Sequence, residues 1–112
     1  MDKLATQRCQ PIARGAPALD QADISPLLLQ LPHWTVAGDH TSLRREFRFR
    51  DFYATMAFVN ALAWIAHQQD HHPDLQVGYN RCLVTWSTHT VSGLSLNDFI
   101  CAARTDTLEA NS

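Results

Sequence analysis

The chain has 112 residues, of which 46% are hydrophobic, and its nine Lys and Arg against eleven Asp and Glu give a net charge of −2. A chain of this length builds one domain around one core and is too short for two. The charge balance excludes a strongly basic surface, so neither nucleic acid nor a membrane surface is an expected partner. No segment approaches the run of roughly 18 apolar residues that a membrane span needs.

The three cysteines are Cys9, Cys82 and Cys101. The number is odd, and two of them lie within apolar patterns, where a free cysteine behaves as a small hydrophobe. We therefore expect no disulfide framework and a reducing, cytoplasmic setting.

The N-terminal segment mixes proline, glycine and isolated charges without a hydrophobic period. This composition predicts an extended arm over residues 1–18, followed by a single domain over residues 19–112. The segment also lacks the apolar core that a secretory leader carries behind its basic start, so no leader is predicted.

The first helix is predicted where Asp20 and Asp23 precede apolar residues at helical spacing. Pro26 leaves a second start open, because a helix can begin at Ser25 with proline in its first position.

Residues 33–50 change to a hydrophobic period of two, with a turn at Gly38–Asp39. The alternation predicts a β-hairpin with one buried face. That face consists of Trp34, Val36, Leu43, Phe47 and Phe49. The arginines opposite are expected in solvent rather than at a ligand site, and Arg45 interrupts the apolar face.

Residues 52–69 contain neither glycine nor proline and follow Asp51, which can cap a helix. Their apolar residues recur at helical spacing and predict a central helix. One stripe is Phe52, Met56, Val59, Ala63 and Ala66, with Phe58, Leu62 and Ile65 beside it. This apolar surface, over residues 52–66, is wider than one sheet face requires. We interpret the surplus as a self-association surface, with deep burial of the helix as the alternative.

A second hairpin is predicted beyond Pro73, where apolar and polar residues alternate around a two-residue turn at Asn80–Arg81. Such a turn sets three pairs on one face: Tyr79 opposite Cys82, Val77 opposite Val84, and Leu75 opposite Trp86.

The last helix is predicted beyond Gly93, where Ser95 and Asp98 form a capping-box pattern ahead of an apolar stripe. The elements then run in the order α-β-β-α-β-β-α. This order predicts an α+β domain with a four-stranded antiparallel sheet and helices packed on one of its faces.

Four histidines gather near the ends of two predicted elements: His67, His71 and His72 where the central helix ends, and His89 where the last strand ends. Imidazole titrates near neutrality, so several together suit proton transfer at oxygen and nitrogen. Structural alternatives remain for three residues. His67 lies on the polar line of the helix and is expected in solvent, His71 can complement the helix dipole, and Asp98 can serve as a cap.

A metal site is the main rival interpretation. His67 and His71 are four residues apart, as two zinc ligands on one helix face would be, and His89 could be the third. No glutamate lies between the pair, however, and the helix is expected to stop before Pro73. We therefore predict no metal. A serine triad is disfavoured too, because no serine lies in a glycine-flanked elbow.

A family resemblance rests on a motif of five spaced segments: His71-His72-Pro73, Tyr79, Thr88-His89, Gly93-Leu94-Ser95 and Asp98. The motif resembles that of the pterin-4a-carbinolamine dehydratase family. Similar blocks occur at Leu31-Pro32-His33-Trp34, at residues 47–52 and at Asn97-Asp98-Phe99, so the resemblance covers about residues 20–108.

The resemblance implies an activity. Members dehydrate 4a-hydroxytetrahydropterin to quinonoid dihydropterin, which recycles the tetrahydrobiopterin-type cofactor of aromatic amino acid hydroxylases. They use no metal or organic cofactor, and the pterin is the substrate. The three active-site histidines of the family correspond here to His71, His72 and His89, and its pterin contacts to Asp70, Ser87, Thr88 and Asp98.

The resemblance also implies a homodimer or homotetramer, here through residues 52–66 and the sheet edges. Two alternatives stay open, because some members bind transcription-factor dimers and related proteins are linked to molybdopterin metabolism.

The chemistry suits this assignment. Loss of hydroxide from a carbinolamine needs an acid at the leaving oxygen and a base at a ring N–H, and each contributes about 10²- to 10⁴-fold. We expect His71 and His72 to form the proton-transfer pair and His89 to orient the hydroxyl group. Asp70 can accept hydrogen bonds from the amino and N–H edge of the pterin.

Overall fold

The computed structural model describes residues 3–109. Its elements, in chain order, are the 3-10 helix η1 (Leu4–Thr6), α1 (Gln21–Leu28), β1 (Thr35–Ala37), β2 (Ser42–Arg48), α2 (Phe52–Gln69), β3 (Asp74–Val77), β4 (Arg81–Trp86), the 3-10 helix η2 (His89–Val91) and α3 (Leu96–Glu109). The predicted order is therefore confirmed, with two short 3-10 helices in addition.

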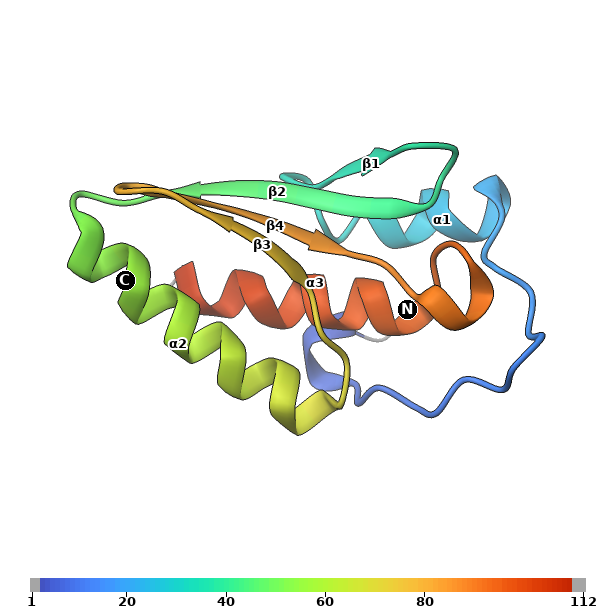
Figure 1. Cartoon of the computed structure of the whole chain (residues 1–112). Coiled ribbons are helices and arrows are strands. Elements are labelled where there is room, and N and C mark those ends of the chain that lie inside the picture. Colours follow the sequence, from blue (N-terminus) through green and yellow to red (C-terminus); the bar gives the residue numbers. More distant parts are fainter. Residues whose placement is uncertain (1–2, 110–112) are drawn as a thin grey trace.

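The four strands form one antiparallel sheet in the order β1-β2-β4-β3. The helices lie on the same side of this sheet (Figure 1). The covered face carries the buried side chains of Leu43, Phe47, Cys82, Val84 and Trp86. The predicted α+β fold, with helices on one face of a four-stranded sheet, is confirmed.

The predicted register of the β3–β4 hairpin is wrong by two residues. Leu75 lies opposite Val84 and Val77 opposite Cys82, and residues 78–80 form the loop. The side chain of Thr55 donates a hydrogen bond of 2.9 Å to the carbonyl of Tyr79, and the amide of Phe49 donates one of 2.8 Å to the carbonyl of Asn80. These contacts from outside the hairpin hold both residues in the loop. A slip of two keeps every side chain on its predicted face.

Helix α2 begins as predicted, because the Asp51 carboxylate accepts a hydrogen bond from the Ala54 amide at 2.8 Å. Its buried residues are Thr55, Phe58, Leu62 and Ala66, so the buried seam lies to one side of the predicted stripe. Phe52, Tyr53 and Trp64 are 50%, 81% and 60% exposed. Deep burial of the whole helix is therefore wrong for the single chain.

Helix α1 begins at the first of its two expected starts. The side chains of Asp20 and Asp23 each accept a hydrogen bond from the backbone amide of the other. Pro26 consequently lies inside the helix, and the alternative start at Ser25 is wrong.

Arg45 interrupts the apolar face because it forms a largely buried ion pair. Its guanidinium lies 2.7 Å from Asp106 of α3 and 4.3 Å from the ring centroid of Phe47, and the Arg45 side chain is 10% exposed. A charge on the inner face is thereby paired rather than left alone.

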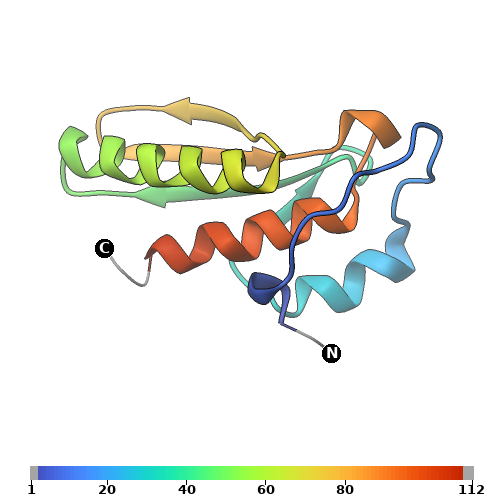
Figure 2. The ribbon, with the colours of Figure 1, turned by 90° about the horizontal axis from the view of Figure 1, so that it is seen from below.

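The N-terminal segment runs across α3 (Figure 2). Leu4 of η1 belongs to the core, with 1% of its surface exposed. Farther along, the Cys9 amide donates to the side chain of Gln69 at 2.8 Å, and Arg104 of α3 donates to the carbonyl of Gln7. Residues 4–9 therefore take part in the packing, and the division into an arm and a domain at residue 18 stays a prediction. Within the described residues, no helix has the length and apolar character to cross a membrane.

Candidate active site

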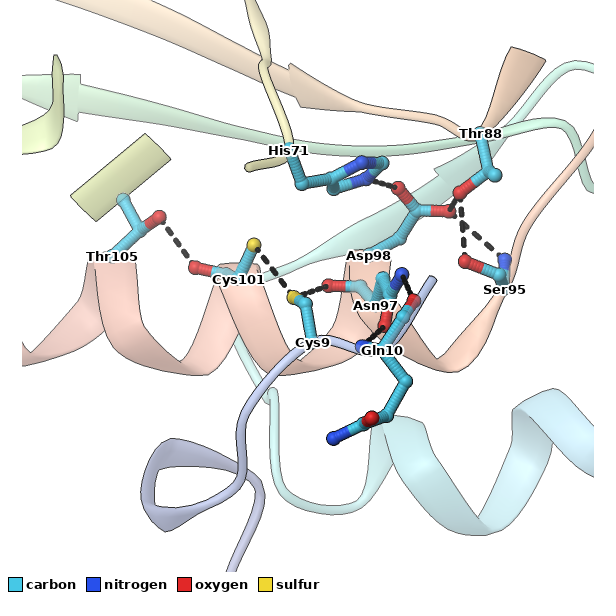
Figure 3. A network of polar contacts seen from close by, with 9 residues as sticks. All are labelled: Cys9, Gln10, His71, Thr88, Ser95, Asn97, Asp98, Cys101 and Thr105. Carbon is cyan, nitrogen blue, oxygen red and sulfur yellow. Dashed lines mark hydrogen bonds and ion pairs between the residues drawn. The ribbon is translucent and has the colours of Figure 1, made fainter. Parts of the chain in front are cut away.

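The corner after α2 owes its shape to Asp70, which ends the helix in the left-handed conformation (φ 51°, ψ 44°). Aspartate tolerates this conformation better than most residues. The next amide, that of His71, donates a hydrogen bond of 3.2 Å to the carbonyl of Ala66. The backbone thus folds back on the last helical turn, and the His71 side chain points toward α3 (Figure 3).

His71 and Asp98 are in direct contact. Nε2 of His71 lies 2.6 Å from Oδ1 of Asp98 in the first turn of α3 (Figure 3). The Asp98 side chain is fully buried, and the His71 side chain is 14% exposed. The imidazole also stacks on the indole of Trp86, with ring centroids 5.4 Å apart and an interplanar angle of 15°.

The second carboxylate oxygen of Asp98 is occupied as well. Oδ2 accepts a hydrogen bond of 2.7 Å from the hydroxyl of Thr88 and one of 2.9 Å from the amide of Ser95. Asp98 therefore caps α3, as predicted, and holds His71 at the same time. A buried carboxylate needs several donors of this kind, since burial of an unpaired charge is costly.

The electrostatics favour a protonated His71. Burial lowers the pKa of this imidazole, but the hydrogen bond and the negative charge of Asp98 raise it more, with smaller contributions from Cys9 and Asp70. The net pKa of His71 lies above the ordinary histidine value. An imidazole tuned in this way can act as an acid near neutral pH.

A hollow lies beside this network, at the end of β4. The amide of Thr88 donates a hydrogen bond of 2.9 Å to the carbonyl of Gly93, and this pairing closes the short loop that carries η2. The hollow has a volume of about 220 Å³ and is lined by Thr41, Ser87, Thr88, His89, Ser92 and Gly93. It is smaller than the roughly 300–1,000 Å³ that is typical of pockets for drug-sized ligands.

The structure brings some of the predicted site residues together. His71, Thr88 and Asp98 are joined by direct contacts, and Ser87 and His89 line the hollow next to Thr88. The other two, Asp70 and His72, are exposed at the corner after α2. Their roles toward a substrate stay predictions.

His67 lies apart from this network. It is exposed and stacks on Trp64, 5.8 Å between ring centroids, on the outer side of α2. Within residues 3–109, no three His, Cys, Asp or Glu side chains are placed as ligands of one metal ion.

Trp86 is a site residue that the sequence pattern did not reveal. Its position was predicted only from the apolar alternation of β4, and nothing in that pattern indicates contact with a histidine fifteen residues earlier. The indole Nε1 is buried without a hydrogen-bond partner among the described residues. A site-forming role for a buried aromatic residue depends on tertiary contacts and has no local signal.

A larger cavity than this hollow lies elsewhere, at the opposite end of α2. It has a volume of about 560 Å³ and is lined mainly by phenylalanine and alanine side chains, with Arg48, Arg50, Tyr53 and Glu109 at its polar margin. No histidine reaches it, so its chemistry does not match that of the His71 network.

Comparisons with known proteins agree with the geometry. The family model "Pterin 4 alpha carbinolamine dehydratase" matches residues 17–108. A Nitrosospira multiformis protein, provisionally named a pterin-4-alpha-carbinolamine dehydratase, is 53% identical over 108 residues, which are 96% of this chain and 94% of the relative. A Stenotrophomonas maltophilia protein with the same provisional name is 56% identical over 105 residues, 94% of this chain and 90% of the relative.

Two solved structures share the fold. A transcriptional coactivator/pterin dehydratase from Brucella melitensis has a TM-score of 0.77 and 28% identity, covering 81% of this chain and 97% of that one. A pterin dehydratase-like protein described as a RuBisCO assembly factor in the alpha-carboxysome has a TM-score of 0.61 and 28% identity, covering 70% and 92%. By its sequence match over residues 17–108 and by these relatives, the chain belongs to the pterin-4-alpha-carbinolamine dehydratase family of hydro-lyases.

Proposed function

We propose that the chain converts 4a-hydroxytetrahydropterin to quinonoid dihydropterin and water by histidine acid–base catalysis. The observation that carries this proposal is the contact between His71 and the buried Asp98. A carboxylate behind an imidazole fixes its orientation and stabilises its protonated form, which is what an acid for a leaving hydroxyl group requires.

The acid in this proposal is His71. Its Nε2–H donates to Asp98, so Nδ1 is the nitrogen left to exchange a proton with the substrate. Protonation of the 4a-oxygen by Nδ1–H lets the C–O bond break and water leave. The raised pKa of His71 supports this role, because a useful acid must carry its proton near the working pH.

The base in this proposal is His72, which follows His71 at the same exposed corner. It takes the proton from the ring nitrogen beside the departing hydroxyl group, and the N–H electron pair forms the C=N bond. His89 orients the hydroxyl group from the hollow. Ser87 and Thr88 contact the pterin there, while Asp70 accepts from its amino edge.

The pterin is the substrate in this scheme, and the proposal needs no metal or organic cofactor. The proposed role in a cytoplasmic setting is to recycle a tetrahydrobiopterin-type cofactor. A pterin of molybdopterin metabolism is the alternative substrate. Initial rates measured with this pterin and with 4a-hydroxytetrahydropterin show which of the two the chain prefers.

A direct dehydration assay tests this function. The purified chain should accelerate loss of the 4a-hydroxyl group from 4a-hydroxytetrahydropterin equally with and without a chelator. His72→Ala and His89→Ala should fold normally and lose most of the acceleration. His33→Ala, at an exposed position away from the site, should keep it. Near wild-type rates in both site variants, or activity that the chelator removes, would contradict the proposal.

A second, compatible proposal concerns assembly. The exposed aromatic side chains of Phe52, Tyr53 and Trp64 on α2 favour a homodimer or homotetramer through residues 52–66 and the sheet edges. Gel filtration with light scattering tests this assembly. A monomer would overturn it and would favour another protein partner for α2.

A further inference from the structure

The arm and α3 bring two cysteines together. Sγ of Cys9 lies 3.4 Å from Sγ of Cys101, although 92 positions separate them in the chain (Figure 3). Sγ of Cys9 also contacts the backbone carbonyl of Asn97 at 3.6 Å. Both thiols are free.

The backbone around Cys9 is held in place by side chains of α2 and α3. The Cys9 amide donates to the side chain of Gln69 at 2.8 Å. The next residue, Gln10, exchanges two hydrogen bonds with the side chain of Asn97, at 3.0 and 2.8 Å. The sulfur atoms are therefore held close together by contacts of their neighbours. A disulfide, with a length of about 2.05 Å, needs only a small further approach.

The two thiols differ in a way that suits a stepwise oxidation. Cys9 is half-buried, whereas Cys101 is fully buried. The hydrogen bond from Cys101 lowers the pKa of Cys9; burial opposes this effect, and the positive charges of His71 and Arg104 assist it. The pKa of Cys101 is raised by the same hydrogen bond and by burial. Cys9 is thus the thiol that reacts as a thiolate, and Cys101 is the thiol that resolves the product.

We propose that Cys9 and Cys101 form a reversible intramolecular disulfide when the folded protein meets a hydroperoxide. The Cys9 thiolate attacks the peroxide oxygen, the O–O bond breaks, and an alcohol or water leaves with one proton while Cys9 becomes a sulfenic acid. Cys101 then attacks the Cys9 sulfur, the S–O bond breaks, and the hydroxide leaves as water with the proton of Cys101. The peroxide is reduced by two electrons, and each sulfur loses one.

The bond would lock the arm onto α3 one turn beyond Asp98, beneath the His71 network (Figure 3). A reversible disulfide is compatible with the expected absence of a structural disulfide framework. In reducing compartments, disulfides usually occur as transient, redox-sensing pairs of this kind. The inference rests on the sulfur geometry and is independent of the proposed dehydratase activity.

Treatment of the folded chain with hydrogen peroxide, followed by thiol titration and non-reducing peptide mapping, tests this proposal. Free thiols should fall from three to one in a monomer-sized chain, with Cys9 and Cys101 in one linked peptide pair. Dithiothreitol should restore all three. The matched control Cys82→Ala removes the fully buried cysteine of β4 and should leave the linkage unchanged.

Two variants keep the test decisive. Cys9→Ser, at the half-buried arm position, should abolish the linkage without disturbing the packing of the core. Cys101→Ala removes the second sulfur atom and should abolish the linkage as well. Three thiols that survive peroxide would overturn the proposal. So would a linkage through Cys82, a linkage only between two copies of the chain, or a Cys9 that proceeds to sulfinic acid without pairing.

Discussion

The imidazole of His71 and the carboxylate of Asp98 lie 2.6 Å apart, one just beyond the end of α2 and the other in the first turn of α3. The carboxylate is fully buried and is bonded at its other oxygen to Thr88 of the loop after β4. The Asp98 side chain therefore connects the end of α2, the loop after β4 and the start of α3. Its partner at the end of α2, His71, is the acid in the proposed chemistry.

Asp98→Asn should reduce the dehydration rate by about 10²-fold or more, since that is the smallest usual contribution of a positioned acid. The amide keeps the size of the side chain but removes the charge that holds up the pKa of His71. An NMR titration should place the pKa of His71 below its wild-type value. The control is Asp74→Asn, at an exposed position. Wild-type kcat/KM and an unmoved His71 titration would contradict the account.

The free energy of unfolding should depend on pH through the titration of His71. Because Asp98 raises the folded pKa of His71 above the unfolded value of about 6.5, its contribution is fully present below about pH 6.5 and is lost as the pH rises through the folded pKa. Urea unfolding of the wild type and of His71→Gln across this range measures the contribution. The difference between the two proteins should shrink as the pH rises, and a difference that stays constant or grows would be inconsistent with a raised pKa.

Arg45→Ala should lower the unfolding free energy by about 1–3 kcal/mol, the usual cost of a lost hydrogen-bonded charge. The change leaves Asp106 without the guanidinium that lies 2.7 Å away and uncovers the ring of Phe47. Arg44→Ala makes the same change on the exposed face of the same strand and should cost within about 0.5 kcal/mol. Equal losses in urea unfolding would show that the inner ion pair is not stabilising.

Leu4→Ala should cost about 2–5 kcal/mol, as for other leucines removed from a core. Leu4 is 1% exposed, whereas Leu29, at the end of α1, is 84% exposed. Leu29→Ala should therefore change the unfolding free energy by no more than about 0.5 kcal/mol. Similar thermal midpoints for the two variants would mean that residues 3–6 do not contribute to the core.

The helices and strands that were predicted correctly are determined by residues close to them in the sequence. Asp51 caps α2 through the Ala54 amide, three residues away, and Asp98 caps the start of α3 through the Ser95 amide. Hydrophobic period and caps are local, so the order of helices and strands was predictable.

The errors arose where distant residues decide the local structure. The loop after β3 is set by Thr55 of α2, which bonds the carbonyl of Tyr79. The local sequence favours a two-residue turn, because a local pattern contains no information about the contact with Thr55. The buried seam of α2 is likewise set by its neighbours, because most of its residues are apolar and a period alone does not choose among them.

For the candidate site, the sequence motif named residues but did not predict the contacts between them. The motif indicated His71 and Asp98, yet their direct bond joins residues 27 positions apart. The stack of His71 on Trp86 and the approach of Cys9 to Cys101 have no counterpart in any local pattern. Such contacts depend on how α2, β4, α3 and the arm pack together.

The most direct test of the central claim is the rate at which the wild-type chain and His71→Ala dehydrate 4a-hydroxytetrahydropterin, measured by stopped flow against the spontaneous reaction. Acid catalysis by His71 predicts clear acceleration by the wild type and a loss of about 10²-fold or more in the variant, with a folded circular dichroism spectrum in both. A wild-type chain that does not exceed the spontaneous rate, or a folded His71→Ala variant that matches the wild type, would contradict it.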